Sequence, residues 1–393
     1  MGGAFQIWFP FPRGKGLGVR FLAFYADKDY TVDETVLMAA QKVMEGNLGL
    51  HWYDAKTERI SGRPSDPKRG LTYQDLNVGT CGYTDIPEDV RTSQSMVSRG
   101  SEKVGKLPDM GYVVNRKSDV WSDNVAELYE EVKARRWVPA TDIAWGELHT
   151  HPLAPELEMA CAQLYTFLQE CQIVSMDFPS KWVPLINQDF LEQKSWMCAQ
   201  MLDASRLFEV FRKRALFGGA GLGRASATAE QGLKEWLWAD HYPQGSVSIN
   251  MSLAGFLLVL YRQVAAFSPT NVDRKIMRYA MQDAARQTAY GLGQLRYHLK
   301  HRPLEVNTME AYLDHTEHAL LGLIGSPELL EPMIIICGGG LEKAQVDKGR
   351  VATAKFIKLV VKEYMERIAA AGLTGHSKRS KIPAMIDRIS AAA

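Results

Sequence analysis

The sequence has few cysteines, almost no net charge and no long uninterrupted apolar run. Its 393 residues include five cysteines, an odd number, and no Cys-x-x-Cys pair. Scattered thiols of this kind favour a reducing compartment, so we expect a cytoplasmic protein. The formal net charge of +1 gives no reason to expect nucleic acid or an anionic membrane as a partner. Because no run of about eighteen apolar residues and no signal-peptide pattern is present, neither a membrane span nor secretion is predicted.

The composition is that of a globular protein, with 46% hydrophobic and 23% charged residues. This length can form one large helical domain or two smaller ones. Cys161, Cys171 and Cys198 fall in segments with helical apolar periodicity. We expect these three thiols to belong to the core.

Two segments about eighty positions apart share one pattern inside long apolar-periodic stretches. Asp203–Arg206 reads Asp-Ala-Ser-Arg, and Asp283–Arg286 reads Asp-Ala-Ala-Arg. In a helix each Asp can pair with the Arg three positions later, across one turn. The residues that follow the two arginines are Leu207 and Gln287.

These segments resemble the metal-binding helices of the ferritin-like di-iron oxygenases, which include the ribonucleotide reductase small subunit and the bacterial multicomponent monooxygenases. In that family they normally read Asp-Glu-x-Arg-His, and the Glu and His, three apart, ligate iron. The resemblance implies that Ala204 and Ala284 stand where the family has Glu. It likewise implies that Leu207 and Gln287 stand where the family has His.

The family's other two ligands are single glutamates on the preceding helices. The stretch Leu168–Val174 followed by Pro179 partly matches the family pattern and implies Gln172 at the ligand position, although Glu170 lies two positions away. The stretch Ser252–Phe256 resembles a family segment and implies Ala254. The resulting spacings agree, with 32 positions from Gln172 to Ala204 and 30 from Ala254 to Ala284.

The resemblance therefore implies six vacated ligand positions: Gln172, Ala204, Leu207, Ala254, Ala284 and Gln287. Asp203, Arg206, Asp283 and Arg286 remain as pairs beside them. Four buried carboxylates without a metal would be costly, so these replacements suit a metal-free member of the fold. No cofactor is expected in this chain.

Other metal-capable side chains lie outside the motif. Glu147, His149 and His151 precede Pro152 in a loop pattern, for which we expect a surface or capping role. His315 and His318 lie on one face of a predicted helix, and we expect a structural role for them. Together with Glu170, these residues are the candidates for a relocated metal.

The predicted fold is mainly α, a ferritin-like four-helix bundle with extra C-terminal helices. Residues 1–115 are expected to form a mixed α/β region or arm. It includes a strand-like stretch at Val19–Ala26 and a helix that follows the capping-box pattern Thr31–Glu34 and ends at Gly46. Residues 116–375 are expected to form the ferritin-like helical domain, and residues 376–393 a basic, solvated tail.

Apolar periodicity and turn signals predict the individual helices. The four core helices form two successive hairpins and span Pro155–Met176, Asn187–Leu216, Ser246–Phe267 and Asn271–His301. Pro179 and Pro184 are expected to bound the connection inside the first hairpin. Further helices are predicted at Asn307–Ile324, Glu328–Ile336 and Val351–Ala371.

Three functions are compatible with these patterns. The first is a non-catalytic, metal-free subunit that pairs with a homologous catalytic di-iron subunit, which would hold the iron. The second is an active oxygenase with a relocated metal site. The third is a small-molecule-binding protein that uses the vacated cavity, although a filled core is the simpler expectation.

Overall fold

The structure is a computed structural model that describes residues 34–50, 61–73, 75–76, 96, 110–219 and 221–391. The chain divides into two compact units, Met1–Arg59 and Ile60–Ala393. Within the described ranges the secondary structure is helical, and the only β pairing there consists of two isolated bridges, Asp66 with Gly70 and Val114 with Ile186.

In the first unit, helix α2 spans Glu34–Met44. Thr31, the predicted cap of this helix, lies outside the described residues. Gly46 follows it with a φ of +88°, a left-handed conformation that favours glycine and ends the helix. None of the residues of α2 is buried. The predicted strand at Val19–Ala26 lies outside the described residues.

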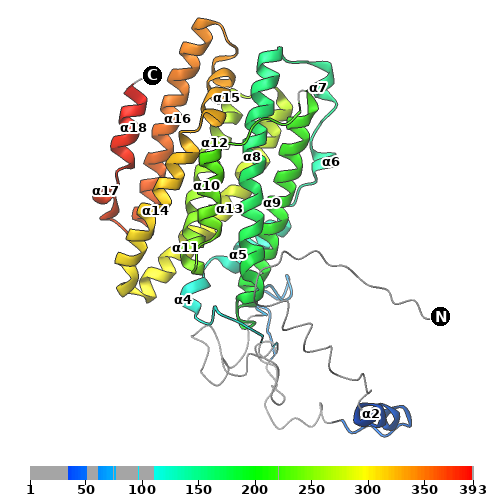
Figure 1. Ribbon diagram of the computed structural model, residues 1–393. Coiled ribbons are helices and arrows are strands. Elements are labelled where there is room, and N and C mark those ends of the chain that lie inside the picture. Colours follow the sequence, from blue (N-terminus) through cyan, green and yellow to red (C-terminus); the bar gives the residue numbers. More distant parts are fainter. Residues whose placement is uncertain are drawn as a thin grey trace, which may run out of the picture. The chain divides into compact units, whose positions relative to one another are not determined.

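Four long helices form the bundle in the second unit, as predicted. They are α8 (Pro155–Trp182), α9 (Leu191–Phe217), α12 (Ala254–Phe267) and α13 (Asn271–His301). Figure 1 shows them side by side in green and yellow-green, with α8 beside α9 and the ends of each hairpin joined by a short connection. The Thr270 side chain caps α13 by accepting a hydrogen bond from the backbone of Asp273.

Three of these helices differ from the prediction. Helix α9 begins at Leu191, four residues after the predicted Asn187. Helix α8 continues through Pro179 to Trp182, because a proline near the end of a helix removes only one late backbone hydrogen bond. The third helix is not one regular element. It consists of α11 (Tyr242–Ser246), a π-helix labelled η2 (Val247–Leu253) and then α12.

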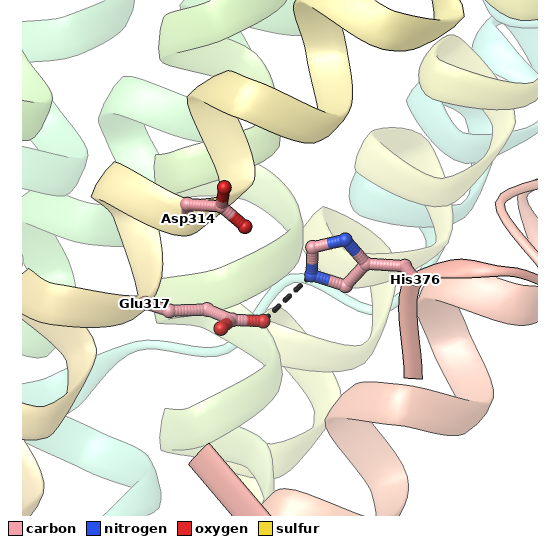
Figure 2. A group of neighbouring side chains, drawn as sticks. All are labelled: Asp314, Glu317 and His376. Atoms are coloured by element: carbon pink, nitrogen blue, oxygen red, sulfur yellow. Dashed lines mark hydrogen bonds and ion pairs between the residues drawn. The ribbon is translucent and has the colours of Figure 1, made fainter. Parts of the chain in front are cut away.

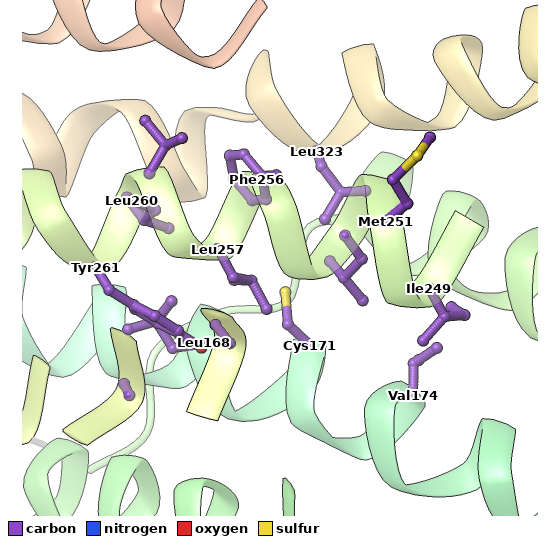
Figure 3. Close-up of a cluster of buried hydrophobic side chains, with 14 of the residues drawn as sticks. Leu168, Cys171, Val174, Ile249, Met251, Phe256, Leu257, Leu260, Tyr261 and Leu323 are labelled. Carbon is purple, nitrogen blue, oxygen red and sulfur yellow. The ribbon is translucent and has the colours of Figure 1, made fainter. Parts of the chain in front are cut away.

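The core lies where α12 and η2 face α8. Figure 3 shows Leu168, Cys171 and Val174 of α8 pointing toward Ile249, Leu257 and Tyr261 on the opposite side of this core. The stretch Tyr242–Phe267 is long and apolar enough to cross a membrane, but 72% of its most apolar window is buried inside the structure. Burial of this kind is typical of the central helix of a folded core.

Short helices lead into the bundle, and longer ones pack around it. The leading helices are α4 (Lys117–Val120), α5 (Val125–Ala134), α6 (Pro139–Asp142) and α7 (Glu147–Thr150). The surrounding helices are α10 (Ala227–Leu237), α14 (Val306–Ile324), α15 (Pro327–Gly338) and α16 (Lys343–Ala370). Two 3-10 turns, η1 (Val183–Leu185) and η3 (Pro303–Glu305), connect neighbouring helices.

The C-terminal segment corrects the prediction of a solvated tail. It forms α17 (His376–Arg379) and α18 (Ile382–Ala391), and α18 packs against α16 (Figure 1). Ile382 and Ile386, one helical turn apart, are buried. This segment therefore belongs to the folded domain.

The cysteines also differ in part from the prediction. Cys161 and Cys171 are buried, as expected for core thiols, whereas Cys198 is exposed. Cys198 lies one turn from the exposed Leu202 on α9, so apolar periodicity alone placed it on the wrong face.

Candidate functional site

The centre of the bundle holds a cavity of about 10 Å³ between the four long helices. Its walls are Gln172 of α8; Trp196, Gln200, Asp203, Ala204 and Leu207 of α9; Leu257 and Tyr261 of α12; and Asp283, Ala284 and Gln287 of α13. Five of the six positions singled out in the sequence are in this set. A cavity of this size has room for about one water molecule.

Side-chain amides connect the helices around this cavity. Gln172 donates a hydrogen bond to the Tyr261 hydroxyl at 2.9 Å. Gln200 and Gln287 both donate to Oδ1 of Asn250, at 2.9 and 3.2 Å. Asn250 in turn donates to the Ser246 hydroxyl at 3.1 Å. These neutral groups satisfy one another in a place where an unpaired polar atom would be costly.

Asn250 is the π-helical residue that joins this amide network, and sequence reasoning missed it. The structure places Ala254 one turn further along, buried but outside the walls of the cavity. A count that assumes regular α-helix cannot anticipate a π-helical turn, which changes the direction of every later side chain. A sequence signal did exist, because Ser246, Ser248, Asn250 and Ser252 interrupt an otherwise apolar segment.

Two aspartates and two arginines form a closed group beside the amides. Each Asp pairs with the Arg three residues later, Asp203 with Arg206 and Asp283 with Arg286. The pairs also cross between the helices, because Arg286 contacts Asp203 at 2.8 Å and Arg206 contacts Asp283 at 3.5 Å. The formal charges of the two carboxylates and the two guanidinium groups therefore cancel.

Trp137, in the segment that precedes α6, completes this group. Its indole nitrogen donates to Asp283 at 3.0 Å, and its carbonyl oxygen accepts from Arg206 at 3.2 Å. The Arg206 guanidinium also lies over the Trp137 ring, 5.0 Å from its centre. Burial raises the pKa of Asp203 and of Asp283, while the arginines oppose this rise.

The side chains at this centre do not fit a di-iron site. A di-iron centre of the ferritin-like type takes four carboxylates and two histidines. Here the only acids in the cavity wall are Asp203 and Asp283, both already paired with arginine, and the wall contains no histidine. Neutral amides and alanines cannot offset the charge of two iron ions.

The alternative metal candidates do not come together either. Glu147, His149, His151, His315 and His318 are exposed, and Glu170 is half-buried on α8. The His149 ring packs against the Phe217 ring in a tilted arrangement, with 4.6 Å between ring centres, and His315 lies 3.5 Å from Glu235. Among the described residues, the one group of three metal-capable side chains is Asp314, Glu317 and His376.

Comparison with solved structures gives matches that share the fold. An R2-like ligand-binding oxidase with an aerobically reconstituted metal cofactor after photoconversion is 17% identical, with a TM-score of 0.50 over 64% of this chain and 95% of that chain. Two mutants of that oxidase with an anaerobically reconstituted Mn/Fe cofactor are 17% and 18% identical, with the same TM-score over 64% of this chain and 94% of theirs.

Comparisons at the level of sequence give no match. No protein-family model matches the chain, and no curated protein does. At 17% and 18% identity the solved structures support an assignment of architecture and leave activity open. The four-helix arrangement, with its helical additions, agrees with that assignment. This chain therefore has the ferritin-like fold of the R2-like ligand-binding oxidases.

Proposed function

We propose that this chain is a non-catalytic ferritin-like subunit that pairs with and supports a homologous catalytic di-iron oxygenase subunit. The observation that carries this proposal is the centre of the bundle. Amides, alanines and a neutral group of two aspartates and two arginines fill the place where the fold can hold metal, and only about 10 Å³ remains. Iron is expected in the partner subunit.

The bundle keeps what a supporting subunit needs. Buried polar contacts join α8 to α12, α9 and α13 to η2, and α9 to α13, so the bundle forms a firm unit without metal. Its outer surface offers apolar contacts, because Met159, Ile173 and Leu202 on α8 and α9 are 60%, 40% and 50% exposed. We expect the partner to cover this face in a contact of more than about 1,000 Å².

The cavity gives no support to a small-molecule-binding function. Ligand pockets usually enclose about 300–1,000 Å³, whereas this cavity encloses about 10 Å³. Trp196, Leu257 and Tyr261 are among the side chains that close it. We therefore prefer a filled core, as the sequence also suggested.

The experiment is expression of the full chain with and without a homologous chain that keeps both Glu-x-x-His motifs. When the two chains are expressed together, we expect them to purify together, with iron in the partner. When this chain is expressed alone in iron-supplemented medium, we expect it to contain no iron. Two iron ions bound per copy of this chain would overturn the proposal. So would a stable monomer that does not bind the homologue.

A matched variant tests where the two chains meet. Leu202→Glu places a charge on the exposed face of α9 and should prevent co-purification while leaving the folded chain intact. Val351→Glu, at a comparably exposed position on α16 (49% against 50%), is the control and should leave co-purification unchanged.

A further inference from the structure

A second polar group lies away from the bundle centre, where α14 meets α17 (Figure 2). Asp314 and Glu317 lie three residues apart on α14, and His376 is the first residue of α17. One carboxylate oxygen of each acid and one ring nitrogen of His376 all lie within 4.8 Å of one another. The three side chains therefore converge from two segments far apart in the sequence.

The group is closed on one side and open on the other. Glu317 is 5% exposed and His376 is 0% exposed, whereas Asp314 reaches solvent. Nε2 of His376 lies 2.7 Å from Oε1 of Glu317, as the dashed line in Figure 2 shows. Ser380 donates to the other oxygen of Glu317 at 2.8 Å. An ion that enters from the side of Asp314 reaches two buried ligands.

We propose that Asp314, Glu317 and His376 bind one divalent transition-metal ion of the Zn²⁺ class. Two carboxylate oxygens and an imidazole nitrogen are typical zinc ligands, whereas Mg²⁺ and Ca²⁺ prefer oxygen ligands alone. Donor atoms about 2.1 Å from a tetrahedral ion are about 3.4 Å apart. The His376–Glu317 distance of 2.7 Å is shorter than that value, and all three donor atoms lie within 4.8 Å of one another. Small side-chain rotations therefore suffice to bring the three donor atoms to the spacing that a tetrahedral ion requires.

Arg379 is the competing cation at this site. Its Nε contacts both oxygens of Asp314, at 3.0 and 2.8 Å, and its terminal nitrogen contacts Asp314 as well. The guanidinium thus supplies the positive charge that Asp314 would otherwise receive from the ion. Binding of the ion displaces this ion pair, so the affinity for metal reflects the competition between Arg379 and the ion.

The bound ion would connect the C-terminal segment to α14. Glu317 and Asp314 belong to α14, while His376 precedes α18, whose apolar face packs on α16. An ion that binds the folded state alone stabilises it by mass action. The site is thus a structural one, and it is independent of the proposed pairing with a catalytic subunit.

The experiment uses the full chain after removal of metal with a chelator. Isothermal titration with ZnCl₂ should give one ion per chain, and Zn²⁺ should raise the thermal unfolding midpoint, while MgCl₂ should do neither. Asp314→Asn and Glu317→Gln should each weaken Zn²⁺ binding by more than about tenfold. Arg379→Ala should tighten it, which a merely structural group would not do.

The control is His318→Ala, which removes an exposed imidazole next to Glu317 and should leave Zn²⁺ affinity unchanged. Asp314 reaches solvent, so Asp314→Asn should stay folded even if changes at the buried Glu317 do not. Equal Zn²⁺ affinity in the unmodified chain and Asp314→Asn would overturn the site, as would unchanged or weaker binding in Arg379→Ala. Neither result would bear on the proposed function, which is tested by iron content and co-purification.

Discussion

Arg214 shows how single residues hold the bundle together without metal. Its side chain is 0% exposed, and it contacts Asp273 of α13 at 2.7 Å and Glu158 of α8 at 2.6 Å. The Tyr165 hydroxyl donates to the same aspartate at 2.8 Å. A buried charge is tolerated only when its partners satisfy it, so these contacts must form together. Three of the four long helices meet at this one guanidinium.

The substitution Arg214→Met should lower the free energy of unfolding by about 3–5 kcal/mol, because it leaves Asp273 buried without its cation. Denaturant unfolding followed by circular dichroism measures the change. Arg212→Met, two positions away on the exposed face of α9, is the control and should change stability by less than about 1 kcal/mol. Equal losses in the two variants would contradict this account.

Glu170 should make stability depend on pH. Burial raises its pKa from 4.5 to about 7, and Glu230 and Glu328 add to the rise. The protonated form is thus favoured by folding, so the contribution of Glu170 to stability is present below about pH 4.5 and is lost as the pH rises to about 7. Glu170→Gln should be more stable than the unmodified chain at pH 8 and no more stable at pH 4.5.

Urea unfolding at the two pH values measures this difference. Glu366→Gln, on the exposed face of α16, is the control and should leave the pH profile of stability as it is in the unmodified chain. A Glu170→Gln variant whose stability has the same pH profile as that of the unmodified chain would show that protonation of Glu170 does not affect stability.

The π-helix η2 is the element that most affects the centre of the bundle. Its seven residues are all buried, and α13 approaches its backbone closely at Gly291. A Cβ atom at position 291 would lie 2.6 Å from the carbonyl carbon of Asn250. Glycine is therefore required there for a close approach between helices. The same approach holds Asn250 near Gln287.

Gly291→Ala should destabilise the protein although alanine is the better helix former. Overpacking typically lowers the free energy of unfolding by about 1–3 kcal/mol, and the higher helix propensity of alanine offsets up to about 1 kcal/mol of this loss. Thermal unfolding measures the net loss. Gly146→Ala, where a Cβ would meet no atom within 4 Å, should be close to neutral. A stabilised Gly291→Ala variant would mean that the two helices can move apart freely.

At the scale of elements, the sequence predicted regular helices well and irregular ones poorly. Helix α13 spans Asn271–His301 as expected, because Thr270 caps it and its apolar face has a constant period. The continuation through Pro179 and the π-helix were not predicted, since both depend on tertiary packing more than on local propensity. The paired aspartates and arginines were found, and Asn250 was missed for the same reason as the π-helix.

At the scale of the whole molecule, the C-terminal segment closes the domain. Its basic residues suggested a solvated end, but Ile382 and Ile386 share one face and pack on α16. The charges of Lys378, Arg379 and Lys381 concealed this short apolar repeat. The pair Ile382 and Ile386 alone is too weak a periodic signal to outweigh a charged stretch.

Truncation after Gly375 should therefore destabilise the domain. It removes the buried His376 and two buried isoleucines. The isoleucines alone are worth about 1.5–3 kcal/mol each, so the free energy of unfolding should fall by at least about 3–6 kcal/mol. Denaturant unfolding of the truncated chain tests this value. A loss of less than about 1 kcal/mol would restore the prediction of a solvated tail. Lys381→Ala, which removes only an exposed charge, serves as the control.

The position of Asn250 also has a consequence for protein engineering. Anyone who wished to install a metal in this bundle would begin by changing Asn250 to an acid, because Asn250 already lies within hydrogen-bonding distance of Gln200 and Gln287. Neither Asn250 nor Ala254 lines the cavity itself, but an acid at Ala254 would be introduced one turn away from the residue that both glutamines contact. The π-helix thus determines which residue should be changed first in any redesign of this bundle as a metalloprotein.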